Sequence, residues 1–208
     1  MDIKSAYDLW CSTYDLDSNL TRDLDQAMTK VAFIGRRFGN ILELGCGTGK
    51  NTALLAEISK KVHALDFSEG MIAQAKQKLD ASNVEFSQAD LTKHWPSKND
   101  GHDLIICNLV LEHIEDLSHI FKEAFRSLRK GGSFYISELH PFRQYQGGRA
   151  HFQRDLQVTE VPAFVHHVSE FLQAAAANNL VLESFNEYWH AEDQGKPPRL
   201  AVFMFKKP

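Results

Sequence analysis

Three glycines at alternate positions, Gly45, Gly47 and Gly49, separate a short apolar run from a segment that can form a helix. The apolar run at residues 41–44 has the length of a buried strand, and residues 51–56 continue as the helix. Because glycine has no Cβ atom, a ligand can approach the backbone of such a turn closely. The unpaired N–H groups at the start of the helix point toward that ligand. The pattern therefore predicts a strand, turn and helix that bind a nucleotide-like molecule.

The rest of the chain repeats this alternation of apolar runs and helical patterns. Five short apolar segments predict parallel strands joined by helical crossovers: residues 41–44, 62–65, 84–87, 103–107 and 133–137. Two more apolar runs, residues 180–185 and 200–205, flank a turn-prone segment and predict a terminal antiparallel hairpin. The expected fold class is α/β, with a doubly wound, seven-stranded, mostly parallel sheet in a single domain over residues 1–208.

Polar side chains stand where the predicted strands end. Asp66 ends the second strand, at about the distance from a glycine turn where a carboxylate lies beside a ribose. Asp90 follows the third strand, where it either contacts a ligand or caps its own loop. Asn108 follows the fourth strand and His113 comes soon after, with no turn glycine between them. Because the carboxyl ends of parallel strands meet at one edge of the sheet, we expect the ligand there.

The first 38 residues precede the sheet and have a helical pattern. A helix over residues 18–37 is expected from an apolar stripe at steps of three or four: Leu20, Leu24, Ala27, Val31 and Ile34. An aromatic segment with Tyr7 and Tyr14 comes before this helix, and it either covers the sheet edge or closes over the ligand. We expect residues 1–38 to form a helical lid.

A second covering segment is expected between the fifth strand and the last helix. Helical periodicity is lost from Phe142 to Val165, and this stretch contains Tyr145, two adjacent glycines and Arg149. A loop of this length in a compact domain is usually functional or disordered. We expect residues 142–166 to be an insertion that covers a substrate.

Composition excludes several classes of protein. The net charge is −4 and no basic stripe is present, which argues against a nucleic-acid partner. The three cysteines lack C-x-x-C spacing, so they suggest neither a disulfide framework nor a zinc site, and they fit a reducing environment. No signal-peptide pattern is present, and no uncharged run approaches the roughly 20 residues of a membrane span. We expect a cytoplasmic monomer or homodimer with a small-molecule substrate, no membrane contact and no metal.

The glycine spacing distinguishes two families. Dinucleotide-binding proteins carry G-x-G-x-x-G, whereas this chain has G-x-G-x-G preceded by Glu43 and Leu44. Residues 43–49, Asp66, Asp90 and residues 103–113 resemble, in this order, the motifs of the class I S-adenosylmethionine-dependent methyltransferases. The resemblance covers nearly the whole chain. It implies the methyltransferase fold, S-adenosyl-L-methionine as cofactor and S-adenosyl-L-homocysteine as product.

The resemblance also implies roles for individual residues. The glycines of the turn would pass close to the methionine part of the cofactor, with Glu43 supporting the turn. Asp66 would accept hydrogen bonds from both ribose hydroxyls, and Phe67 would flank the adenine. Asp90 and Leu91 would meet the edge of the adenine.

Methyl transfer is an in-line displacement on a cationic sulfur, and it needs alignment more than covalent help from the protein. The resemblance implies that Asn108 lies near this sulfur. An acceptor hydroxyl also needs a base, for which the sequence offers His113 and His140 after the fourth and fifth strands. The expected substrate-binding residues come from the two covering segments: Tyr7, Tyr14, Tyr145 and Arg149.

Two other functions remain open at the level of sequence. A nicotinamide-dependent oxidoreductase shares the strand, turn and helix, although the glycine spacing and the terminal hairpin disfavour it. A non-catalytic protein that binds S-adenosylmethionine would keep the glycine turn and have a closed or apolar substrate side. The sequence favours a methyltransferase that acts on a small molecule, and it does not identify the acceptor atom.

Overall fold

A seven-stranded sheet forms the centre of the computed structural model. The structure describes residues 2–148, 151–154 and 157–208. For residues 151–154 and 157–160 it describes the backbone alone. The strands lie in the order β3-β2-β1-β4-β5-β9-β8. Their bounds are Phe38–Leu44 (β1), Ser59–Asp66 (β2), Val84–Gln88 (β3), His102–Asn108 (β4), Leu128–Leu139 (β5), Val181–Tyr188 (β8) and Leu200–Lys206 (β9). Strands β1 to β5 pair in parallel, and β9 lies antiparallel between β5 and β8. This arrangement confirms the predicted α/β sheet with its terminal hairpin.

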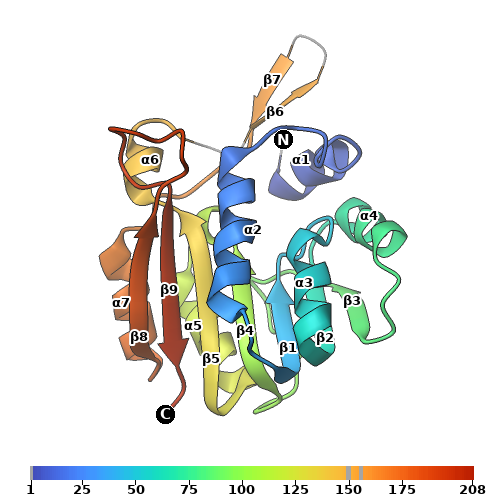
Figure 1. Ribbon diagram of the computed structural model, residues 1–208, viewed down its shortest axis with the longest axis vertical. Coiled ribbons are helices and arrows are strands. Elements are labelled where there is room, and N and C mark those ends of the chain that lie inside the picture. The colour runs from blue at the N-terminus through green and yellow to red at the C-terminus, as the bar shows by residue number, and fades with distance from the viewer. Residues whose placement is uncertain (1, 149–150, 155–156) are drawn as a thin grey trace.

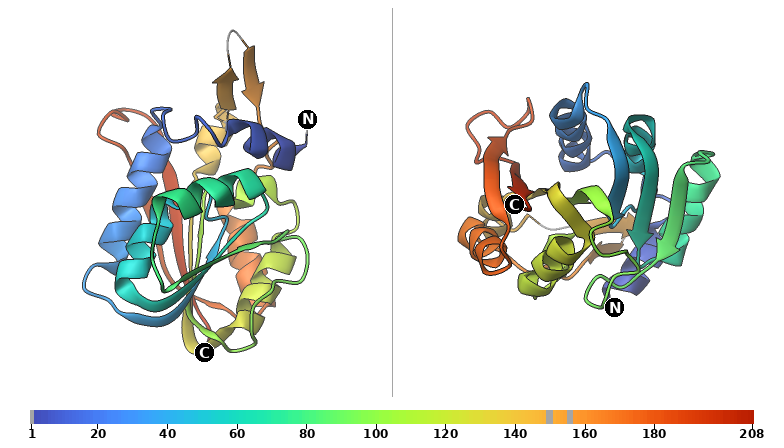
Figure 2. Two further views of the ribbon diagram at one scale, coloured as in Figure 1. Left: turned by 90° about the vertical axis from the view of Figure 1, so that its right-hand side faces the viewer. Right: turned by 90° about the horizontal axis from the view of Figure 1, so that it is seen from below.

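Helices cover both faces of this sheet (Figures 1 and 2). One face of the sheet is covered by α2 (Leu20–Phe33) and α3 (Lys50–Ile58). The other face is covered by α5 (Leu117–Ser127) and α7 (Val168–Ala177). A fifth helix, α4 (Glu69–Lys78), packs beside β2 and β3. Within the described ranges, none of the helices combines the length and the apolar composition that crossing a membrane requires.

The central strands are apolar on both faces because both faces are covered by helices. In β1, Leu42 and Leu44 belong to the cluster under α5 and α7, whereas Ile41 belongs to the cluster under α2 and α3. In β4, Ile105 belongs to the cluster under α5 and α7, and its neighbour Ile106 belongs to the cluster under α2 and α3. All five side chains are fully buried. The predicted strands therefore appear in the sequence as continuous apolar runs rather than as alternating ones.

The predicted apolar stripe on α2 is wrong, although the helix itself lies where the sequence places it. Val31 and Ile34 are 60% and 78% exposed. Of the predicted stripe, Leu24 alone is buried, and the face toward the sheet also carries Asp25, Met28, Thr29 and Phe33. Two of these positions are polar because Asp25 and Thr29 accept hydrogen bonds from the side chain of Asn108 at the end of β4. A search for apolar periodicity passes over such positions and selects the wrong face.

The N-terminal segment crosses the edge of the sheet at which the parallel strands end (Figure 1). It begins with α1 (Ile3–Trp10), in which Ala6 and Trp10 are buried. These two side chains pack against Val161, which belongs to the segment that follows β7. A small apolar cluster of its own, distinct from the two clusters of the sheet, therefore holds α1 in place.

Residues 142–166, for which the sequence predicted loss of regular structure, contain both a helix and a hairpin. The helix is α6 (Pro141–Tyr145), and the hairpin consists of β6 (His151–Arg154) and β7 (Gln157–Glu160). The hairpin projects beyond the sheet at the same end as α1 (Figure 1). The two segments expected to cover the site thus lie at one end of the sheet, and their roles as covers stay predictions.

Candidate cofactor and substrate site

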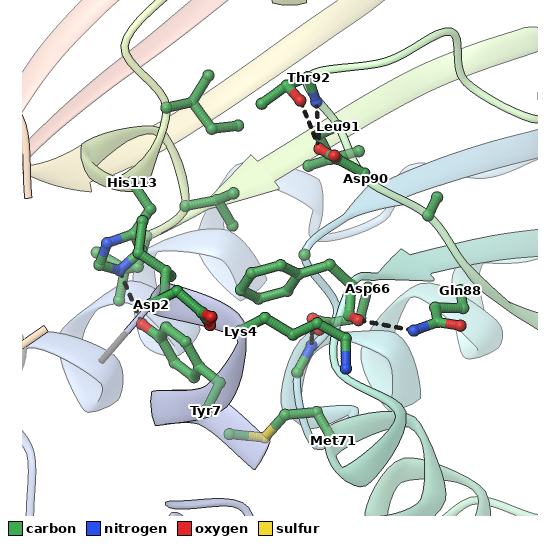
Figure 3. Close-up of a pocket in the computed structure, with 18 of the residues that line it drawn as sticks. Asp2, Lys4, Tyr7, Asp66, Met71, Gln88, Asp90, Leu91, Thr92 and His113 are labelled. Atoms are coloured by element: carbon green, nitrogen blue, oxygen red, sulfur yellow. Dashed lines mark hydrogen bonds between the residues drawn. The ribbon is translucent and has the colours of Figure 1, made fainter. Parts of the chain in front are cut away.

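A cavity of about 620 Å³ lies between α1 and the carboxyl ends of the parallel strands (Figure 3). Its walls come from the glycine turn, the ends of β2 and β3, the loop after β4, and the N-terminal segment. Ten of the predicted site residues line it: Tyr7, Tyr14, Gly45, Gly47, Asp66, Phe67, Asp90, Leu91, Asn108 and His113. Lys4, Met71 and Val110 also line it and carry no signal in the sequence, because their residue types are common and only their position brings them here.

The turn after β1 needs glycine for both its conformation and its space. Gly45 has a φ of 69° and Gly49 has a φ of 84°, a left-handed conformation that residues with a Cβ atom rarely adopt. A Cβ atom on Gly45 would lie 2.2 Å from Cγ2 of Val110. Gly49 is also the N-cap of α3, so the unpaired N–H groups of that helix begin at the turn. The turn therefore presents bare backbone at the cavity wall.

Glu43 supports this turn from behind the cavity wall. Its carboxyl accepts a hydrogen bond of 2.6 Å from the hydroxyl of Thr52 in α3. Burial raises the pKa of Glu43 to about 8, so the carboxyl is mostly protonated at neutral pH. Glu43 thus joins β1 to α3 and adds little negative charge to the site.

Asp66, at the end of β2, is the buried acid of the cavity wall. Its Oδ2 accepts the backbone N–H of Gly47 at 2.8 Å, and its Oδ1 accepts the backbone N–H of Ser68 at 2.9 Å. Burial raises the pKa of Asp66, and these backbone donors oppose the rise because they favour the ionised form. Each oxygen of an ionised carboxylate can accept a further hydrogen bond. Asp66 is therefore oriented in advance to accept hydroxyl groups of a ligand.

The cavity wall combines apolar side chains with a second carboxylate. Phe67, Met71 and Leu91 supply apolar surface. Asp90 accepts hydrogen bonds from the backbone N–H and the hydroxyl of Thr92, at 2.9 and 2.7 Å, so it caps its own loop. Asp90 also lines the cavity, so its position fits both alternatives that the sequence leaves open, a ligand contact and a loop cap.

Asn108 marks the other side of the cavity, at the end of β4. Its side-chain amide donates to Oδ1 of Asp25 at 2.6 Å and to the hydroxyl of Thr29 at 2.9 Å, both in α2. Burial raises the pKa of Asp25. The chain then turns through Leu109, whose φ of 57° makes the turn for which the sequence offers no glycine. The sequence did not identify Asp25, because a single acid in a helix carries no signal of burial.

His113 joins three elements around the cavity. It ends the short helix η1 (Leu111–His113) in the loop after β4. Its Nε2 lies 2.8 Å from the hydroxyl oxygen of Tyr7 in α1, and its Nδ1 lies 2.8 Å from the carbonyl oxygen of Pro162. Figure 3 shows the hydroxyl of Tyr7 pointing toward the ring of His113, and the two rings meet at an angle of 75°. Tyr14, the second predicted tyrosine, lies beneath the guanidinium of Arg22, 4.1 Å from the ring centre.

Two further contacts tie the N-terminal segment to the loops of the cavity. Asp8 accepts a hydrogen bond of 2.5 Å from the hydroxyl of Ser68, which is also the N-cap of α4. Asp15 accepts a hydrogen bond of 2.8 Å from the hydroxyl of Thr48 in the glycine turn. Together with Tyr7, these residues connect the segment to the loops after β1, β2 and β4.

Five predicted residues are not among those that line the cavity: Glu43 and Gly49, which support the turn as described above, and His140, Tyr145 and Arg149. His140 is buried, where its Nε2 lies 2.8 Å from Oε1 of Glu187 and its Nδ1 accepts the backbone N–H of Phe142 at the start of α6. Tyr145 is 54% exposed, and its hydroxyl bonds to the ring of His167. Arg149 lies outside the described residues. Of the two histidines predicted as bases, His113 is the one at the cavity.

Comparison with known proteins agrees with this geometry. Residues 42–136, from β1 to β5, match the family described as "Methyltransferase domain". The fold matches the solved structure of the N-methyltransferase NodS from Bradyrhizobium japonicum WM9 in complex with S-adenosyl-l-homocysteine, with a TM-score of 0.76, 16% identity and all of both chains covered. Residues 42–136 are therefore similar to a methyltransferase domain, within a fold that the chain shares with S-adenosylmethionine-dependent methyltransferases. The matched residues include the glycine turn from Gly45 to Gly49.

Curated relatives of this chain differ in what their names say they act on. A malonyl-[acyl-carrier protein] O-methyltransferase of Bacillus anthracis is 29% identical over 142 residues, which cover 65% of this chain and 51% of the relative. An arsenite methyltransferase of Homo sapiens is 31% identical over 114 residues, which cover 48% of this chain and 30% of the relative. The chain spans about half the length of the first relative and less of the second.

Asp66→Ala is expected to weaken the binding of S-adenosylmethionine at least about tenfold. Hydrogen bonds to a charged carboxylate contribute about 1.5–3 kcal/mol each, and about 1.4 kcal/mol corresponds to a factor of ten. Isothermal titration calorimetry measures the affinity, and circular dichroism checks that the variant is folded. If the variant unfolds, and the fraction that stays folded binds like the parent, Asp66 is a structural cap and its assignment to the ribose fails.

Glu138 in β5 holds the loop that carries η1. Its Oε1 accepts the backbone N–H groups of Val110 and Leu111 at 3.0 and 2.9 Å. Burial raises the pKa of Glu138 from 4.5 to about 8. Between these two pKa values the folded chain retains a proton that the unfolded chain releases, so the free energy of unfolding falls as the pH rises.

Glu138→Gln removes this titration and keeps an oxygen that can accept both N–H groups. From pH 5 to pH 8 the free energy of unfolding of the variant is therefore expected to fall less than that of the parent. Urea unfolding at the two pH values measures both changes. The matched control is Glu183→Gln on the exposed face of β8, which should keep the parent's pH dependence. Parallel pH profiles for the parent and Glu138→Gln would show that Glu138 is ionised in the folded chain.

Proposed function

We propose that this chain transfers a methyl group from S-adenosyl-L-methionine to a small-molecule acceptor and leaves S-adenosyl-L-homocysteine. The observation that carries the proposal is the carboxylate of Asp66, oriented in the cavity wall by two backbone N–H groups with lone pairs left for two ribose hydroxyls. The turn supports it, since nothing lies within 4 Å of where a Cβ atom of Gly47 would be, and the methionine part can lie close to the backbone there. The apolar side chains of Phe67 and Leu91 suit contact with the faces of the adenine ring.

When bound, the cofactor supplies a methyl group on a positively charged sulfur. The residues of the chain would hold and align the reactants, which is the main requirement of an in-line displacement. Asn108 would lie near the sulfur of the bound cofactor. Hydrogen bonds to Asp25 and Thr29 fix its side chain, and they thereby hold its backbone in position. The N-terminal segment would exclude water, because Tyr7 and Tyr14 lie in the cavity wall.

The choice of a small-molecule acceptor rests on the shape and charge of the chain. The N-terminal segment contributes Ile3, Lys4 and Tyr7 to the cavity wall, so a large acceptor would have to displace it. The net charge of −4 disfavours a nucleic-acid acceptor. The three cysteines are free, which supports action in the cytoplasm. A monomeric or homodimeric state stays a prediction.

Ligand binding is expected to follow the glycine spacing. S-adenosylmethionine and S-adenosylhomocysteine should bind with dissociation constants in the low-micromolar to submillimolar range, and NAD should show no measurable binding, because the turn lacks the G-x-G-x-x-G spacing. Isothermal titration calorimetry with the three ligands makes the comparison. Tight binding of NAD with weak binding of the other two would overturn the proposed function in favour of an oxidoreductase.

Turnover separates an enzyme from a protein that only binds the cofactor. A small-molecule extract is incubated with the chain and S-adenosylmethionine whose methyl group carries deuterium, and mass spectrometry detects labelled products. At least one small molecule is expected to gain a labelled methyl group in the presence of the chain and not in its absence. Strong cofactor binding with no labelled product would favour the non-catalytic alternative.

A further inference from the structure

His113 has two ring nitrogens with partners of different kinds. Nδ1 lies 2.8 Å from the carbonyl oxygen of Pro162, and a carbonyl oxygen can only accept a hydrogen bond. Nδ1 must therefore carry a proton. In the neutral ring Nε2 then has a free lone pair, and it lies 2.8 Å from the hydroxyl of Tyr7. The backbone of Pro162 thus selects the tautomer in which Nε2 is a base that faces the N-terminal segment.

Tyr7 donates its hydroxyl proton to this lone pair. Once it has done so, the phenol oxygen still has lone pairs that can accept a hydrogen bond from another group. Tyr7 lines the cavity, so that other group can be a substrate. Burial raises the pKa of Tyr7 well above its usual range, so the side chain stays a neutral phenol that can accept one proton while it donates another.

A positive charge on His113 would be stabilised by its neighbour in the chain. Oε1 of Glu112 lies 3.7 Å from Nε2 of His113, and both side chains are more than 90% buried. Gln144 in α6 donates to the other carboxyl oxygen of Glu112 at 3.3 Å. Burial raises the pKa of Glu112, and the ring of His113 and the amide of Gln144 oppose this rise because they favour the ionised carboxylate.

We propose that Tyr7 and His113 form a proton relay for a hydroxyl acceptor. The inference rests on the proposed methyl transfer. The acceptor oxygen forms a bond to the methyl carbon, the bond between that carbon and sulfur breaks, and its electron pair stays on sulfur. The acceptor proton passes to the oxygen of Tyr7 while the Tyr7 proton passes to Nε2 of His113. The imidazolium later returns a proton to water.

The charge of the cavity wall selects a neutral hydroxyl, such as a phenol or an alcohol. Of the described residues that line the cavity, Lys4 alone is a lysine or arginine, and its ammonium pairs with Asp8 at 2.9 Å. Ile3, Val110 and Ile114 add apolar surface to the cavity, and Asp2, Asp66 and Asp90 add carboxyl groups. A carboxylate or phosphate acceptor would find no free cation on this wall, whereas a hydroxyl needs the base that the relay supplies.

Nuclear magnetic resonance tests the hydrogen-bond chain without a substrate. Long-range proton–nitrogen spectra of the ¹⁵N-labelled full chain report which ring nitrogen of each histidine carries the proton, and loss of signals in His113→Gln assigns His113. At pH 8 we expect a protonated Nδ1 and an unprotonated Nε2. Tyr7→Phe should shift the Nε2 resonance toward that of an imidazole without a donor. Tyr14→Phe removes the other phenol of the cavity wall, and it should leave the Nε2 resonance of His113 unchanged. A protonated Nε2, or an unchanged resonance in Tyr7→Phe, overturns the relay.

A methyl-transfer assay tests the relay in turnover. The parent is assayed with S-adenosylmethionine and a panel of phenols, alcohols, carboxylates, amines and thiols. We expect hydroxyl compounds to be methylated, and Tyr7→Phe and His113→Gln each to lower kcat about 10²-fold, the usual scale for a lost base. The double variant should be no slower than either single variant, because the two residues act as one unit. The affinity for S-adenosylmethionine should stay within about threefold of the parent.

The outcomes separate this inference from the proposed function. If the chain binds S-adenosylmethionine but methylates no hydroxyl compound of the panel, or if Tyr7→Phe keeps the parent's kcat, the relay is overturned and the cofactor assignment stands. If the effects of the two single variants multiply in the double variant, the residues act separately and the relay is overturned as well. If the parent does not bind S-adenosylmethionine, the proposed function itself fails and the relay fails with it.

Discussion

The orientation of the Asp66 carboxylate is the constraint on which the rest of the site depends. One oxygen accepts the N–H of Gly47 in the turn after β1, and the other accepts the N–H of Ser68 in the loop after β2. Parallel pairing of β1 with β2 brings these two loops side by side, and the carboxylate then fixes their relative position. Because the carboxylate is already held by backbone donors, ligand hydroxyls can bind to it with little reorganisation.

The N-terminal segment depends on the same loops. Ser68 donates to Asp8, Thr48 donates to Asp15, and His113 is bonded to Tyr7, so each of three loops of the site has one partner in the segment. We predict that a ligand that orders these loops also holds the segment in the position described here, because the same loop conformation satisfies both.

Much of the fold was predictable because its signals are local. The glycine turn, the apolar runs and the acids at strand ends predicted the sheet and the wall around Asp66. Asp25 was not predictable, because its burial depends on Asn108, 83 positions later in the chain. The role of His140 was equally hidden: it follows β5 as expected, but its ring turns toward Glu187 on β8. Periodicity reports which elements form, and it does not report which distant residue a side chain meets.

A crystal structure of the chain with bound S-adenosylhomocysteine is the sharpest test of the role of Asp66. Both ribose hydroxyls are expected within hydrogen-bond distance of Asp66, with the adenine against Phe67 and Leu91. Tyr7 is expected to remain bonded to His113. S-adenosylhomocysteine bound outside this cavity, or no bound ligand in crystals grown at saturating concentration, would show that Asp66 does not hold the cofactor.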